Sequence, residues 1–225
     1  MQMTRRRVAR LLGACVLLTG GIGGAVLLTS GTAEAAGCGS AVAAGTTCSL
    51  TGTLTLTAGG LNLTSSSALA WGGTLNGLDL NLVDPTTVDQ SYLVDDATGT
   101  GAGWHLTISA TQFATSGSVT LANAGTFSTT GSITSISAIT APTAACSPGE
   151  ACTLPTDETT YPVAITTAAT APASVIIYDA AAATGLGSMT VGVGANPVGW
   201  WLNVPAATAA GTYTSTITLE IIAGP

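Results

Sequence analysis

The chain has 225 residues and a formal net charge of −7, and its four basic side chains are all arginines within the first ten residues. Beyond Ala35 it carries ten acidic residues and neither lysine nor arginine. Nucleic acids and anionic lipid surfaces are held mainly by lysine and arginine, so the composition excludes both as partners of residues 36–225.

The segment 1–35 has the three parts of a secretory signal. A basic stretch, Met3–Arg10, is followed by the apolar run Leu11–Leu28, and Ala33–Ala35 has the A-x-A form of a cleavage site. We therefore expect a signal peptide that is cleaved after Ala35, with export by the general or the twin-arginine route. The mature chain is then secreted and has no membrane span.

Two other interpretations of this segment are less consistent with its sequence. An uncleaved membrane anchor is disfavoured because glycines interrupt the apolar run, which is near the lower length limit for a span. Leu12–Cys15 resembles a bacterial lipobox, which would place a lipid on Cys15. Arg10 lies only five residues before that cysteine, so almost no apolar region precedes it.

The cysteines of the mature chain fall into two close pairs. An even number of cysteines in an exported protein indicates disulfides, and proximity favours local bridges. Four cysteines allow three pairings, and proximity is the only argument for this one. The spacings do not match the close ligand pairs of a zinc site, so no metal is expected. The predicted disulfides are Cys38–Cys48 and Cys146–Cys152.

Apolar residues alternate with polar ones in many short runs, a period typical of strands with one buried face. No run shows a convincing helical period. The pattern predicts an all-β protein: an antiparallel β-sandwich of Greek-key or immunoglobulin-like type with about ten strands. The clearest runs are Leu50–Thr57, Leu78–Leu82, Trp104–Ala110, Val119–Leu121, Tyr161–Ile165, Met189–Val193 and Tyr213–Ile221.

We expect residues 36–225 to form a single β-sandwich domain. Residues 133–155 are rich in Ser, Thr and Pro, which indicates a long surface loop or a linker between two β-halves. The segment Pro205–Tyr213 resembles a tyrosine corner, in which the tyrosine hydroxyl bonds to backbone upstream. An ordinary loop leading into a strand is the alternative.

Two segments, Gly103–Leu106 and Gly199–Leu202, share the pattern Gly-Trp-x-Leu. In a strand, the tryptophan and the leucine of each motif face the same side. These pairs are interpreted either as core or as an exposed aromatic platform for sugar rings. Trp201 faces the opposite side, which makes it the best single contact residue if that side is in solvent. The candidate binding residues are Trp104, Leu106, Trp200, Trp201 and Leu202.

This arrangement resembles the WxL family of bacterial surface proteins, which carry two separated Trp-x-Leu motifs, the second near the C-terminus. The resemblance extends from about Cys48 to Pro225. It implies non-covalent association with the Gram-positive cell wall, through peptidoglycan or an attached polymer, by way of the two Trp-x-Leu segments. The lack of basic residues argues against binding of teichoic acid by charge.

An enzymatic function is not expected, and no cofactor is predicted. His105 is the only histidine and lies inside the first motif, and no G-x-S-x-G elbow surrounds a serine. Carboxylates for a glycosidase exist, but Asp89, Asp95 and Asp96 lie in loop-like sequence, where acidic side chains are usually just solvated. Calcium binding by loop oxygens stays open, although no D-x-D-x-D-G loop occurs. The alternative function is a structural or partner-protein-binding subunit of a surface complex or appendage, which does not bind glycan directly.

Overall fold

A computed structural model describes residues 44–45, 52–66, 68–121 and 127–224. The predicted signal peptide, Cys38 and Cys48 lie outside these residues. The chain divides into two units, and the unit Leu56–Pro225 contains every strand that is described. These are β1 Leu61–Thr64, β2 Leu80–Val83, β3 Tyr92–Asp96, β4 Trp104–Thr111, β5 Phe127–Thr130, β6 Ala144–Cys146, β7 Val163–Ile165, β8 Thr167–Ala168, β9 Val175–Ala180, β10 Gly187–Val191, β11 Gly199–Val204 and β12 Ile217–Ala223, with a short 3-10 helix, η1, at Thr87–Asp89.

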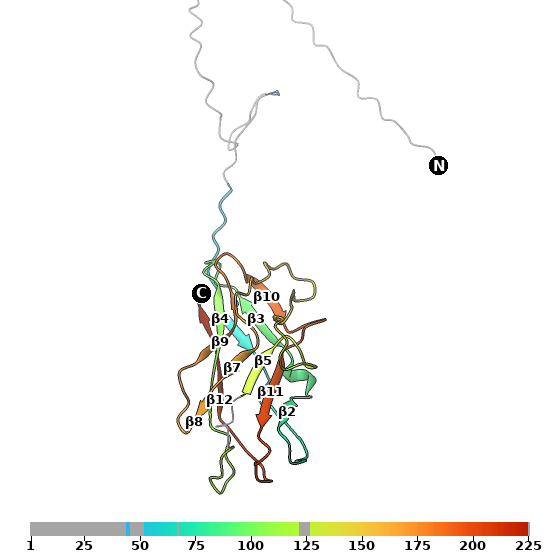
Figure 1. Ribbon diagram of the computed structural model, residues 1–225. Helices are drawn as coiled ribbons and strands as arrows, with labels where there is room; N and C mark the ends of the chain where they lie inside the picture. Colours follow the sequence, from blue (N-terminus) through green and yellow to red (C-terminus); the bar gives the residue numbers. More distant parts are fainter. Residues whose placement is uncertain (1–43, 46–51, 67, 122–126, 225) are drawn as a thin grey trace, which may run out of the picture. The chain divides into compact units, whose positions relative to one another are not determined.

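The strands form three sheets arranged as a sandwich (Figure 1). Their orders are β1-β3-β10-β6, β2-β11-β5-β7 and β12-β4-β8, with β9 also paired to β4. The short β4–β8 pair is parallel, and the other pairs between these strands are antiparallel. The predicted all-β antiparallel sandwich is confirmed.

The core is built on the period of two that the sequence shows. Strand β4 lies between β12 on one side and β8 and β9 on the other. Its residues Trp104, Leu106, Ile108 and Ala110 are all at most 1% exposed. Burying alternate large apolar side chains in this way supplies most of the stability of a sandwich.

The expected strand Leu50–Thr57 is not formed over its described residues, 52–57, and this prediction is wrong there. Leu54 and Leu56 are 80% and 82% exposed. The alternation is that of a strand, but no described residue pairs with this backbone. Pairing begins only with Gly59, whose N–H donates to Ala97 O at 2.8 Å.

Residues 133–155, expected to form a loop or a linker, contain the short strand β6. This strand pairs with β10, so that Met189 lies opposite Cys146. The segment is thereby attached to the edge of the β1-β3-β10-β6 sheet.

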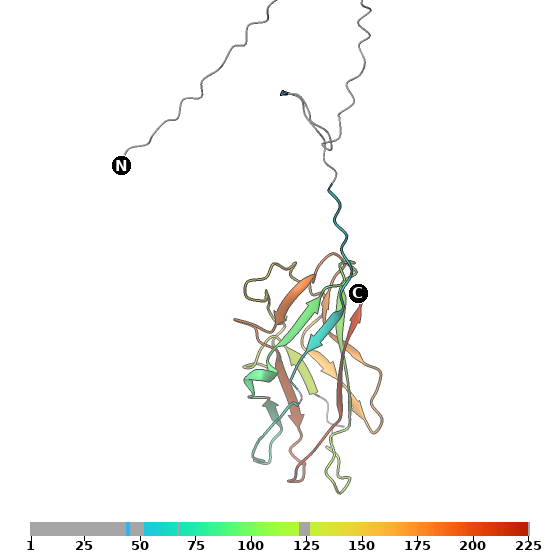
Figure 2. The same cartoon turned by 180° about the vertical axis from the view of Figure 1, so that it is seen from behind.

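The two ends of the sandwich carry different loops (Figure 2). One end holds the start of β1 and the end of β12. The other end holds the loop that follows β4 and the loop that follows β11. In the latter, the Tyr213 hydroxyl donates a hydrogen bond to Ala209 O at 2.9 Å, so the expected tyrosine-corner hydrogen bond is present.

Candidate functional site

Both Trp-x-Leu motifs lie on central strands and are buried. Trp104 and Leu106 are 0% exposed on β4, and Trp200 and Leu202 are 2% and 6% exposed on β11. All four belong to the same core cluster. The sequence left two interpretations of these pairs, a core position or an exposed platform. The structure places them in the core.

Trp201 faces the side opposite Trp200, as the period of two requires, but that side is not in solvent. Trp201 is 7% exposed, so of the two positions that alternation allows, in solvent or on a second buried face, it occupies the buried face. Strand β11 is flanked by β2 and β5. The chain that follows β5 also covers its indole, whose N–H donates to Ser132 O at 2.8 Å.

The indole N–H of the first tryptophan in each motif donates a hydrogen bond to a loop and so attaches that loop to the core. Trp104 donates to Gly185 O at 2.9 Å, and Trp200 donates to Asp89 O at 3.0 Å. Buried tryptophans usually find such a partner, because an unpaired N–H in the core is costly. The motif therefore organises loops as well as filling the core.

The glycine before each tryptophan is required by close packing, which sequence reasoning had not foreseen. A Cβ on Gly103 would overlap the carbonyl oxygen of Ala180, and one on Gly199 would overlap that of Ser132. Gly103 also has φ +79°, a conformation that residues with side chains rarely adopt. The fact that both motifs begin with glycine was the signal available in the sequence.

Two buried carboxyl groups support the η1 loop beside Trp200. Asp84 accepts hydrogen bonds from the N–H groups of Ala70 at 2.7 Å and Thr86 at 2.8 Å. Asp89 is 4% exposed, and burial raises its pKa. The charge of Asp84 raises that pKa further, whereas a hydrogen bond with Ser66 lowers it. These bonds hold the loop in place and leave no water-exposed pair of acids.

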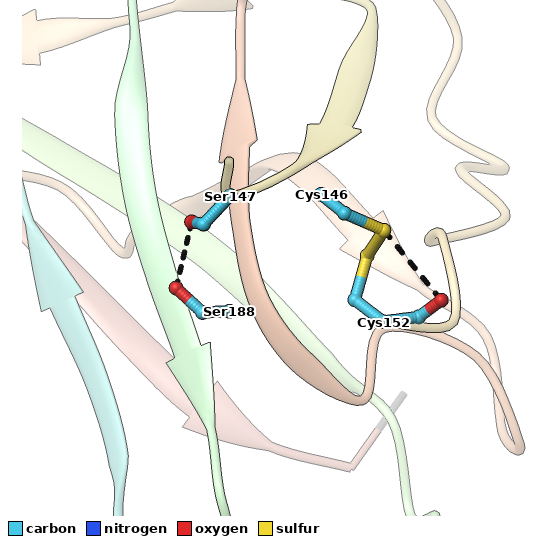
Figure 3. The surroundings of a disulfide bond; sticks show 4 residues. All are labelled: Cys146, Ser147, Cys152 and Ser188. Atoms are coloured by element: carbon cyan, nitrogen blue, oxygen red, sulfur yellow. Dashed lines mark hydrogen bonds between the residues drawn. A yellow bond between two sulfur atoms is a disulfide. The ribbon is translucent and has the colours of Figure 1, made fainter. Parts of the chain in front are cut away.

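The second cysteine pair forms a disulfide, Cys146–Cys152, as its spacing predicted (Figure 3). Beside it, the hydroxyls of Ser147 and Ser188 form a hydrogen bond of 2.7 Å. The Cys38–Cys48 bridge stays a prediction, since both residues lie outside the described part.

Asp157 lies before β7 and contacts β9. Its Oδ1 accepts hydrogen bonds from the N–H groups of Asp179 and Thr159, both at 3.1 Å. Its Oδ2 is 2.9 Å from the Tyr161 hydroxyl, which is also 2.8 Å from Ile177 O. The Tyr161 hydroxyl carries a single hydrogen, and the Asp157 carboxyl and the Ile177 carbonyl are its two acceptors.

The surroundings of Asp157 raise its pKa. Burial, followed by the hydrogen bond with the Asp179 side chain, raises it from 3.8 to about 6, although the hydrogen bonds from Thr159 and Tyr161 act to lower it. The folded chain then holds the carboxyl proton more tightly than the unfolded chain. The stabilising contribution is therefore complete below about pH 4 and is lost as the pH rises through about 6.

We expect Asp157→Asn to raise the free energy of unfolding at pH 7 by about 1 kcal/mol, allowing for partial exposure of the site. Asparagine keeps the accepting oxygen and supplies an N–H donor at every pH. Urea unfolding between pH 4 and 8 should show a weaker pH dependence than in the parent. Glu150→Gln, at an exposed position, is the control, and an unchanged pH dependence in Asp157→Asn would contradict the assignment.

A hollow of about 410 Å³ opens at the end of the sandwich opposite the start of β1. It lies between the loop after β4 and the loop after β11, which meet where Ala114 bridges Thr214. Each Trp-x-Leu strand therefore leads directly into one wall of the hollow. The lining is uncharged and rich in hydroxyl groups: Thr115, Ser116, Val119, Ala209, Ala210, Gly211, Thr212 and Tyr213.

Little in the described residues points to catalysis or metal binding. His105 Nδ1 is 2.6 Å from Gly224 O, so this nitrogen is occupied by a backbone carbonyl and does not face a serine. Within the part of the chain that is described, no group of three or more His, Cys, Asp or Glu side chains could hold a metal ion. Over the same residues, none of the helical structure is long and apolar enough to cross a membrane.

Comparison with known proteins adds one finding to this geometry. A family model described as "WxL domain surface cell wall-binding" matches residues 77–225, a range that contains both Gly-Trp-x-Leu segments. Searches of curated proteins and of solved structures gave no match.

Proposed function

The chain belongs to the WxL domain family of surface cell wall-binding proteins, and on this premise we propose that it is exported and attaches non-covalently to peptidoglycan or a polymer linked to it. It is thus a cell-surface, wall-associated protein, because its family is described as binding the cell wall. The family match is the observation that carries the proposal. Export with cleavage after Ala35, an origin in a Gram-positive cell and the absence of catalysis belong to the same proposal.

In this proposal, the Trp-x-Leu residues contribute to binding indirectly, because they stabilise the fold. Their side chains are at most 7% exposed, so they offer almost no surface to a polymer. They position the two loops that follow β4 and β11. The residues with this supporting role are Trp104, Leu106, Trp200, Trp201 and Leu202.

The contact surface that we propose is the hydroxyl-lined hollow between these two loops. Its volume of about 410 Å³ is within the usual range of small-ligand sites. Thr115, Ser116 and Thr212 can donate and accept hydrogen bonds, as polymers of sugars and short peptides require. Residues 36–225 contain no lysine or arginine, so recognition by hydrogen bonding suits them better than pairing with phosphate.

Filling the hollow should weaken wall binding without affecting the fold. Ser116 is exposed at the rim, and Ser116→Trp should lower the amount of protein retained on isolated walls at least tenfold, or about 1.4 kcal/mol. The measurement is a pull-down of the purified exported protein on protein-stripped walls. Ser174→Trp, at an exposed serine before β9, is the matched control and should bind as the parent does.

Two outcomes would contradict this proposal in different ways. Full binding by a folded Ser116→Trp protein would place the contact surface elsewhere. Binding of the parent to untreated walls but not to protein-stripped walls would favour the alternative function, a subunit that associates with other surface proteins.

A further inference from the structure

The segment Gly52–Ala58 has the composition of a strand but no sheet to join. Leu54 and Leu56 alternate with threonines and are 80% and 82% exposed. No residue from Gly52 to Ala58 hydrogen-bonds to a described residue. An exposed backbone with alternating leucines is a template for pairing with a sheet edge.

The same chain has a free edge of matching pattern. Strand β12 pairs with β4 alone. The bonds Thr111 N–H to Thr216 O and Gly224 N–H to Gly103 O, both 2.9 Å, show that the even-numbered residues of β12 face β4. By alternation, the N–H and C=O groups of Ile217 and Leu219 face away from it, and neither residue has a backbone partner in the described chain.

A cavity lies beside this edge. It has about 90 Å³, and its lining is mixed: apolar side chains including Ile217, Leu219 and Ile108 stand beside polar residues, among them the serines at 65, 66 and 91. The volume is enough for part of an aliphatic side chain on the apolar side formed by Ile217, Leu219 and Ile108. A strand added to β12 would direct every second side chain towards the core, where the leucines could enter.

The segment cannot reach this edge within its own molecule without reversing. Leu61 begins β1 opposite Asp96, the last residue of β3. Ala223 ends β12 opposite Trp104, the first residue of β4. The start of β1 and the end of β12 therefore lie at the same end of the sandwich, as both overall views show, and Ile217 lies at the other.

We propose that Gly52–Ala58 adds as a strand to the free edge of β12 in a second copy of this chain, with Leu54 and Leu56 seated beside Ile217 and Leu219. Each molecule supplies both halves of the contact, a strand and an edge, with the same two-residue spacing. Residues 36–78 carry no charge, so the segment adds no repulsion to a partner whose mature charge is entirely negative. This contact is separate from the wall-binding hollow, and either proposal can fail alone.

The first test is the oligomeric state of the exported protein by sedimentation velocity over a range of concentrations. The parent should form dimers or longer chains. Leu54→Thr/Leu56→Thr should weaken this association at least tenfold. Its melting temperature should equal that of the parent at a concentration where both are monomeric, because both leucines are exposed in the single molecule. Ile139→Thr, at an apolar side chain that is 82% exposed elsewhere, should associate as the parent does. A parent that stays monomeric, or a double variant that associates as well as the parent, would overturn the proposal.

A second test locates the acceptor edge. A synthetic peptide with the sequence of residues 52–59 is added to the isotope-labelled double variant, whose β12 edge is intact. The amides of Ile217 and Leu219 should become protected from hydrogen exchange, and a peptide with threonine in place of both leucines should give no protection. Protection at another strand edge, or no protection at all, would contradict the proposal that the segment binds to β12.

Discussion

Trp200→Ala is expected to reduce the free energy of unfolding by about 3–5 kcal/mol. The side chain is 2% exposed, and its ring centroid lies 6.2 Å from that of Tyr92 and 6.3 Å from that of Phe127. Its removal leaves a cavity and also an unpaired carbonyl at Asp89. Since a domain of this kind has a total stability of about 5–15 kcal/mol, a large share would be lost.

The same loss is expected for Trp201→Ala, and this is the sharper comparison. An exposed Trp201 would tolerate alanine, whereas a buried one that donates to Ser132 O would not. Chemical denaturation of the exported protein gives both values, with Ile139→Ala as an exposed control that should stay within about 0.5 kcal/mol of the parent. A Trp201→Ala protein with parental stability would restore the contact role expected from the sequence.

In these variants, wall retention should fall only as far as the folded fraction falls. Measuring retention below and above the midpoint of unfolding separates the two effects. A Trp200→Ala protein that is mostly folded and yet fails to bind would show that the motif touches the polymer directly.

Gly199→Ala is expected to cost at least about 3 kcal/mol, at the upper end of the range for overpacking. The added methyl group would overlap the carbonyl oxygen of Ser132. That carbonyl is itself held by the indole of Trp201, and the N–H of neighbouring Gly131 donates to Thr140 O at 2.8 Å. The local backbone therefore has little freedom to withdraw.

Gly199→Ala and Gly72→Ala form a matched pair, and their unfolding temperatures are compared by thermal unfolding. A Cβ on Gly72 would meet nothing within 4 Å, so that variant should unfold at nearly the parental temperature. Gly103→Ala should be at least as harmful as Gly199→Ala, because its φ of +79° adds about 1–2 kcal/mol of backbone strain to the overlap. Equal midpoints for Gly72→Ala and Gly199→Ala would mean that Ser132 can move aside.

Much of the fold was predictable because strand alternation is a local signal. Trp104 to Ala110 alternate in the sequence, and the same residues alternate between core and less buried positions in β4. The same signal failed at Leu54 and Leu56. Alternation reports that a segment is suited to a sheet, but pairing also requires a neighbouring strand, which the period cannot reveal.

The properties of the candidate site also divide into those that follow from local sequence and those that depend on distant contacts. The sequence alone was enough to predict export, the likeness to a wall-binding family, the absence of a basic surface, and the opposite faces of Trp200 and Trp201, because each follows from composition or from short-range geometry. The burial of both faces of β11 was set by the packing of distant segments. Trp201 is covered by Ser132, 69 residues away in the chain, and the hollow exists because the loops after β4 and β11 meet. Such contacts depend on which strands become neighbours, and no local pattern encodes that.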